Sequence, residues 1–132
     1  MGVAAINWIA VVVAAIATFV LGGLWYGPLF GRRWMAASGV SEEEVAQGNP
    51  ARTFSISFVL QFVAAAVLAM FIGPEAGLVF GLAAGGAVGL FWVAGAFGVV
   101  YLFEQRPLGH WAVNAGYHVL GYLLMGGILG AF

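Results

Sequence analysis

Residues 3–27 read VAAINWIAVVVAAIATFVLGGLWYG, and this stretch decides the fold. Apart from Asn7 and Thr18, it is an unbroken run of apolar residues and glycines. A helix needs about 20 predominantly apolar residues to cross the hydrocarbon core of a bilayer. The run therefore predicts a helix that spans a membrane.

Three further apolar runs of similar length follow, at residues 51–73, 75–104 and 108–132. Each opens beside a proline, namely Pro50, Pro74 or Pro107. Proline suits the start of a helix because the first backbone N–H has no intrahelical partner. The turns between the last three runs are short, so neighbouring helices should pack antiparallel. The sequence predicts an all-α integral membrane bundle of four transmembrane helices, with residues 1–132 as one domain.

The composition agrees with this class and excludes several others. Hydrophobic residues make up 64% of the 132 residues and charged residues 7%, whereas a soluble domain is about one-quarter charged. The net charge of −1 offers no broad basic face for nucleic acid. The chain has no cysteine, which excludes disulfides and cysteine-ligated metals. It shows no nucleophile–base pair, phosphate loop or zinc motif, so we predict no catalytic residue, cofactor or metal site.

The two ends of the first run raise separate questions. Small residues at Ala15 and Ala17 mimic a signal-peptide cleavage site, but no basic residue precedes the run and the run is too long, so we expect a retained helix. After it, Pro28 should break the helix. In the connection 28–49, Ser41 and Glu44 fit a capping box for a short helix at about 41–47.

The basic residues suggest an orientation. All four should lie on one side of the membrane: Arg32, Arg33, Arg52 and Arg106. The positive-inside rule places that side in the cytoplasm of a cell (plasma or inner) membrane, with both termini on the extracytoplasmic side. Aromatic residues at the same level, Trp25, Tyr26 and Trp34, should anchor the bundle at the interface together with the arginines.

Glycines recur at four-residue spacing in the third and fourth spans. They are Gly81, Gly85 and Gly89, then Gly126 and Gly130. Small residues four apart form a groove in which two helix backbones approach closely. One interpretation is a homo-oligomer built through span three; the other is close packing inside one four-helix bundle.

Polar side chains inside the spans form the candidate site. Counting about 1.5 Å per residue places Gln61, Trp92 and His118 near the midplane. His118 also lies on one face of span four with His110, Asn114, Gly121 and Met125, and Tyr117 flanks that row. Histidine changes charge near physiological pH. In one interpretation, these side chains therefore form a relay for a proton or a solute. Alternatively, they hydrogen-bond across helices and fix the packing.

Two segments carry a resemblance to a known family. They are LGGLWYGPLFGRRW at residues 21–34 and NAGYHVLGYLLMGGILG at residues 114–130, with Asn7-Trp8 before them. Through them the chain resembles the small bacterial membrane proteins grouped as domain of unknown function 1761. The resemblance covers nearly the whole length and implies four helices without assigning an activity or any functional residue.

These observations give two functional hypotheses. The first is a small multi-pass membrane protein that binds or passes a small solute or proton along the polar stripe of span four. The alternative is a non-transporting structural or assembly protein whose polar residues only fix helix packing. An enzyme is not favoured. The expected partners are membrane lipid and further copies of the chain.

Overall fold

The computed structural model describes residues 6–132. In this part of the chain four helices are long and apolar enough to cross a membrane. They are α1 (Trp8–Leu24) with the π-helical segment Trp25–Leu29, α4 (Pro50–Ile72), the continuous run of α5 (Leu78–Ala87), π-helical Val88–Val93 and α6 (Ala94–Glu104), and α7 (Leu108–Ala131). The predicted all-α architecture with four membrane-length helices is confirmed. The predicted helical residues 3–5 lie outside the described residues.

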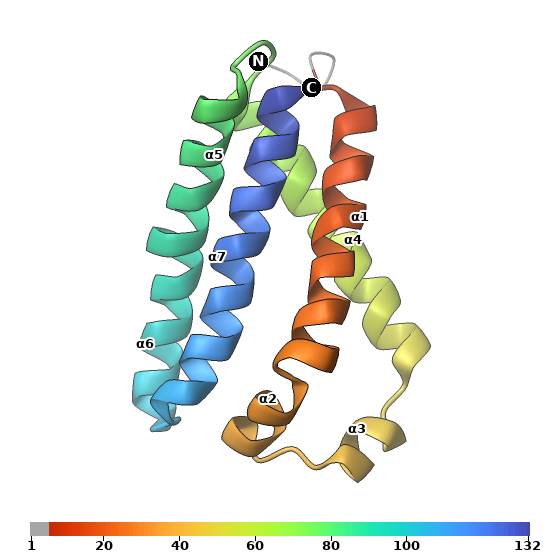
Figure 1. The fold of residues 1–132 in the computed structure, drawn as a ribbon, viewed down its shortest axis with the longest axis vertical. Coiled ribbons are helices and arrows are strands. Elements are labelled where there is room, and N and C mark those ends of the chain that lie inside the picture. The colour runs from red at the N-terminus through yellow and green to blue at the C-terminus, as the bar shows by residue number, and fades with distance from the viewer. Residues whose placement is uncertain (1–5) are drawn as a thin grey trace.

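The helix α7 is the centre of the bundle (Figure 1). It packs against α5 and α6 along one side, against α1 along the other, and also against α4. The start of α1 and the end of α7 lie at the same end of the bundle (Figure 1). The arginines lie toward the other end, which we call the arginine end.

The sequence predicted that the first span ends at Pro28, but the span continues past this residue. It widens there into the π-helical segment Trp25–Leu29, which contains the proline. Proline has no N–H to donate and its ring pushes away the carbonyl four residues before it. The wider turn accommodates the ring, and the N–H of Phe30 donates to the Trp25 carbonyl at 2.7 Å. The helix breaks at Phe30, two residues later than expected.

The long connection contains one helix more than predicted. The helix α2 (Gly31–Ser38) follows Phe30 directly and packs against α7. The helix α3 (Glu42–Gln47) has the capping box, in which the Ser41 side chain accepts from the backbone of Glu44 and the Glu44 side chain accepts from that of Ser41. A helix as short as α2 is marginal on its own, and contact with α7 stabilises it. Its sequence is also too short to show a clear hydrophobic periodicity, so α2 was not predicted.

The third span begins later than the sequence predicted, at Leu78 instead of Glu75. Glu75 and Gly77 have φ angles of 61° and 91°. Both angles lie in the left-handed region, which is incompatible with a right-handed helix. These two residues therefore hold the chain out of the helix until Leu78.

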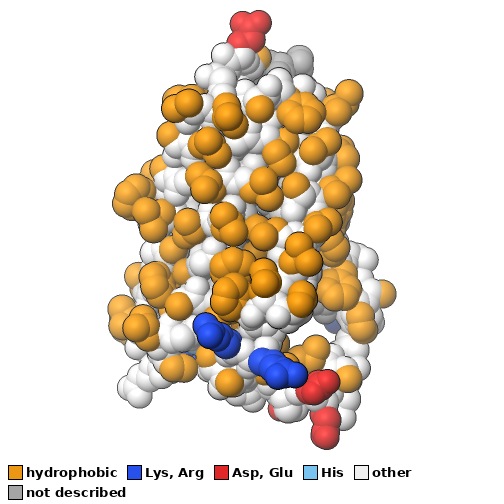
Figure 2. Space-filling view, viewed as in Figure 1, with side chains coloured by type: hydrophobic (Ala, Val, Ile, Leu, Met, Phe, Trp, Pro, Cys, Tyr) orange, Lys and Arg blue, Asp and Glu red, His pale blue; other side chains and the backbone are white. Residues whose placement is uncertain are grey.

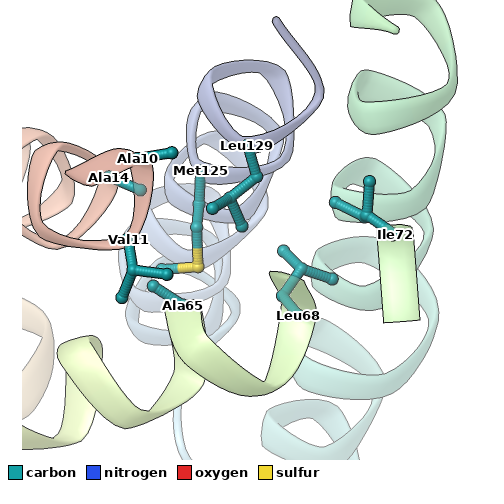
Figure 3. Close-up of a cluster of buried hydrophobic side chains, with 8 residues drawn as sticks. All are labelled: Ala10, Val11, Ala14, Ala65, Leu68, Ile72, Met125 and Leu129. Atoms are coloured by element: carbon teal, nitrogen blue, oxygen red, sulfur yellow. The ribbon is translucent and has the colours of Figure 1, made fainter. Parts of the chain in front are cut away.

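The apolar core lies in the half of the bundle away from the arginine end. Figure 3 shows side chains of α1, α4 and α7 meeting around Met125, whose side chain is fully buried. The cluster consists of Ala10, Val11, Ala14, Ala65, Leu68, Ile72, Met125 and Leu129. The outer surface is also apolar along the bundle, with charged side chains toward its two ends (Figure 2). Such a surface is solvated by lipid hydrocarbon.

The glycines of span three pack within the chain. A methyl group built on Gly81 or Gly85 would lie less than 3.0 Å from backbone oxygens of α7. Methyl groups on Gly126 and Gly130 would collide in the same way with the backbone at Gly77–Gly85. The two rows of glycines therefore face each other. We call this contact the glycine seam. It corresponds to the second interpretation, close packing inside one bundle. Because α7 fills the groove of span three, these glycines no longer indicate an oligomer.

Candidate functional site

Asn114 is the hub of a hydrogen-bond network in the arginine half of the bundle. Its Oδ1 accepts from the Tyr26 hydroxyl at 2.7 Å, and its Nδ2 donates to the Tyr101 hydroxyl at 2.9 Å. The same nitrogen lies 3.4 Å from Nε2 of His110. Asn114 is 9% exposed. One buried amide thus joins the first, third and fourth spans.

A second group of bonds lies deeper in the bundle. Gln61 donates from Nε2 to the Tyr117 hydroxyl at 2.9 Å, and that hydroxyl donates to the Thr18 carbonyl at 3.0 Å. The Tyr26 and Tyr117 rings meet edge-on, with centroids 5.4 Å apart. The two groups of bonds are therefore in contact through their rings. Together they are the polar network, formed by Gln61, Tyr26, Tyr101, His110, Asn114 and Tyr117.

The π-helical turn at the end of the first span positions part of this network. Trp25 donates from its indole to the Val113 carbonyl at 2.9 Å, and Tyr26 reaches Asn114 beside it. The Trp25 ring lies over Gly116, where a methyl group would approach to 3.0 Å. The segments 21–34 and 114–130, which carry the family resemblance, therefore meet here.

His110 has one nitrogen without a partner. It is 7% exposed, and its Nδ1 has no hydrogen-bond partner among the described residues. Asn114 directs an N–H toward Nε2, so Nε2 is the acceptor and the proton of the neutral ring is on Nδ1. The network thus contains a buried donor with no acceptor. Buried polar groups are nearly always paired, so this exception requires an explanation.

The structure does not bring all predicted polar residues together. His118 is partly buried against the Phe97 ring, with centroids 5.1 Å apart, and makes no side-chain hydrogen bond among residues 6–132. Trp92 is 68% exposed and lies outside the polar network. The predicted group therefore divides: Gln61, Asn114 and Tyr117 belong to the network, while His118 and Trp92 do not.

The predicted interfacial anchors also divide. Trp25 and Tyr26 bind span four instead of pointing outward. Trp34 packs edge-on against Tyr26, with centroids 6.0 Å apart. Arg32 and Arg33 are exposed, and the Arg33 guanidinium lies 5.9 Å from the centre of the Phe30 ring.

Arg106 connects two elements at the arginine end. Its Nε lies 3.3 Å from a Glu104 carboxylate oxygen, and its Nη1 donates to the Ser38 carbonyl at 3.1 Å. The second bond ties the end of α2 to the turn before α7. Both charged side chains of the ion pair are about half exposed, so the pair itself contributes little stability.

Two members of the network were not anticipated. Tyr101 was not singled out, and Tyr26 was expected at the interface. Both lie within about one turn of the arginine end of their spans, as His110 does. Comparing depth across spans, at about 1.5 Å per residue, would have placed these three rings at one level. That signal was available in the sequence.

The chemistry of the site is limited to hydrogen bonds and proton exchange. Among residues 6–132 no group of His, Asp and Glu side chains is arranged to hold a metal ion. No carboxylate joins the network, whose members are hydroxyl, amide and imidazole groups. The geometry suits a neutral polar ligand or a water molecule whose oxygen accepts a hydrogen bond from His110.

These features define the class of protein. It is an all-helical protein with four helices that are long and apolar enough to cross a membrane, an apolar core in one half and a polar network in the other. The chain belongs to the family described as "Protein of unknown function (DUF1761)", whose profile matches residues 9–130. No curated protein and no solved structure matches the chain.

Proposed function

We propose that this protein binds a small polar solute at the polar network, and that the ligand enters from the arginine end. The observation that carries this proposal is the open Nδ1 donor of His110. A ligand oxygen, or a water molecule that exchanges with one, supplies the missing acceptor. An unpaired buried donor costs about 1–3 kcal/mol, and binding recovers that cost.

The position of the network supports entry from the arginine end. His110 lies in the first turn of α7, close to that end, and α2 packs against α7 beside it. Toward the opposite end the apolar cluster around Met125 and the glycine seam fill the space between the helices. This conformation favours binding over passage through the membrane. By the positive-inside rule the arginine end faces the cytoplasm and the membrane is the plasma or inner membrane.

Nitrogen NMR of the two histidine rings tests the proposal. In purified protein labelled with ¹⁵N-histidine, His118→Gln leaves one ring, so the His110 signals are assigned directly. We expect His110 to have its proton on Nδ1 and that proton to exchange with water within seconds. Acetamide offers a neutral oxygen acceptor and should shift the Nδ1 resonance. A Nδ1 proton that stays protected for hours would contradict a site open to ligand.

A flux assay separates binding from passage. Liposomes that contain the protein and a pH-sensitive dye should show no more proton leakage than protein-free liposomes. His110→Gln should leave leakage unchanged. Leakage that depends on His110 would instead favour a relay across the membrane.

A second candidate function is assembly without a ligand. It is favoured by Gln61, Tyr117 and the Thr18 carbonyl, which hydrogen-bond to one another across three helices. Interhelical hydrogen bonds of this kind contribute about 0.6 kcal/mol each on average. If His110 proves sealed from water, this candidate replaces the first.

A further inference from the structure

Trp92 occupies an unusual position on the surface of the bundle. It lies in the π-helical segment Val88–Val93, twelve residues before Glu104, and therefore about 18 Å from that end of the span. Half the thickness of the hydrocarbon core is about 15 Å. Trp92 is 68% exposed at this depth. Tryptophan normally lies at the two membrane interfaces, where its indole N–H meets water or headgroups.

The indole N–H of Trp92 has no acceptor among the described residues. The indoles of Trp25 and Trp111, which also lie in membrane spans, both donate to backbone carbonyls of a neighbouring span. Hydrocarbon offers no acceptor, and a polar group left unpaired there is costly. Lipid alone is therefore a poor partner for this surface.

From its hydrogen-bond pattern we infer that the same segment contains an open backbone acceptor. Within it the hydrogen-bond ladder runs from residue i to i−5, and the N–H of Ala94 donates to the Gly89 carbonyl. The α-helix that follows returns to bonds from i to i−4. Where the acceptor changes from residue i−5 to residue i−4, one backbone carbonyl receives no N–H from the helix. That carbonyl belongs to a residue soon after Gly89. Leu90 and Phe91 follow Gly89, and their side chains are 51% and 71% exposed.

We propose that the outward face of Val88–Val93 is the contact between two copies of this chain. In a two-fold dimer with its axis along the membrane normal, residues at the same depth meet. The Trp92 indole of each copy then donates to the open carbonyl of the partner's π-helical turn, while Phe91 packs between them. Because one segment contains both the donor and the acceptor, two copies can form two equivalent hydrogen bonds across the contact. The glycine seam, occupied by α7, takes no part in the contact.

Cysteine cross-linking tests the proposal directly, because the chain has no native cysteine. We compare Phe91→Cys with Val63→Cys in liposomes under mild oxidation. Val63 is a matched control: it is 51% exposed on α4 and lies at a similar depth. Disulfides need Cα atoms within about 7 Å. We expect cross-linked dimers for Phe91→Cys and none for Val63→Cys.

The role of the indole is tested separately with Trp92→Phe, which keeps an aromatic ring and removes the N–H. Single-molecule photobleaching in liposomes measures the fraction of dimer against protein density. Two symmetric hydrogen bonds predict dimerisation that is roughly tenfold weaker in the variant. A monomeric wild type, cross-linking at Val63, or an unchanged dimer fraction in Trp92→Phe would each overturn the proposal.

Discussion

Replacing Gly85 by alanine would place a methyl group where two helix backbones meet. The new Cβ would lie less than 3.0 Å from the Tyr122 carbonyl oxygen and 3.0 Å from the Cα of Gly126. Both neighbours are backbone atoms, which have no side-chain rotation by which to move away. The helices α5 and α7 must therefore separate and lose dispersion contacts along the seam.

The size of the effect follows from two opposing terms. Overpacking costs about 1–3 kcal/mol, and a backbone collision belongs at the upper end. Alanine recovers about 1 kcal/mol because it favours the helix over glycine. We therefore expect Gly85→Ala to lower the free energy of unfolding by about 2 kcal/mol, the difference of these values.

The assay is unfolding by sodium dodecyl sulfate in mixed micelles, followed by circular dichroism. Gly95→Ala is the matched control, because Gly95 lies in the same span and a methyl group there would meet nothing within 4 Å. The control should be neutral or stabilised by up to about 1 kcal/mol. If Gly85→Ala and Gly95→Ala unfold at the same detergent fraction, the reasoning about the glycine seam is refuted.

Three further substitutions test the polar network and its surroundings in the same assay. Asn114→Ala should lower the free energy of unfolding by about 2 kcal/mol, because it leaves Tyr26, Tyr101 and His110 without their shared partner; a loss below about 0.5 kcal/mol would mean that the network is already solvated. Tyr117→Phe keeps the ring and removes two hydrogen bonds, so we expect a loss of about 1 kcal/mol, and an unchanged midpoint would contradict the bonds. Arg106→Gln should change stability by less than about 1 kcal/mol, since its ion pair is exposed, and a larger loss would show that α2 depends on it.

Hydropathy and proline positions predicted the four spans to within a few residues. The signal is strong because hydrocarbon excludes polar residues over a fixed length. The errors occurred where backbone conformation decides the boundary: Pro28 is absorbed by a π-helical turn, and the left-handed Glu75 delays the third span. Neither conformation has a signature in the hydropathy.

The rotation of each helix about its axis was harder to predict. In a membrane both the protein-facing and the lipid-facing sides of a span are apolar, so periodicity does not separate them. Trp92 was therefore grouped with the polar residues although it faces outward, and the glycines gave no indication whether a second chain or α7 fills their groove. The face of span four that contains Asn114 was predictable, because polar side chains there must turn away from lipid.

The central place of α7 has a consequence for biosynthesis. Each hydrogen bond that joins two spans through a side chain, among residues 6–132, has one partner on α7. The ribosome makes this helix after the other three spans. Until α7 is inserted, the side chains of Tyr26, Gln61 and Tyr101 lie in the bilayer without their hydrogen-bond partners. A nascent chain stalled before α7 would therefore expose polar groups to lipid, and cellular quality control should recognise it as unfinished.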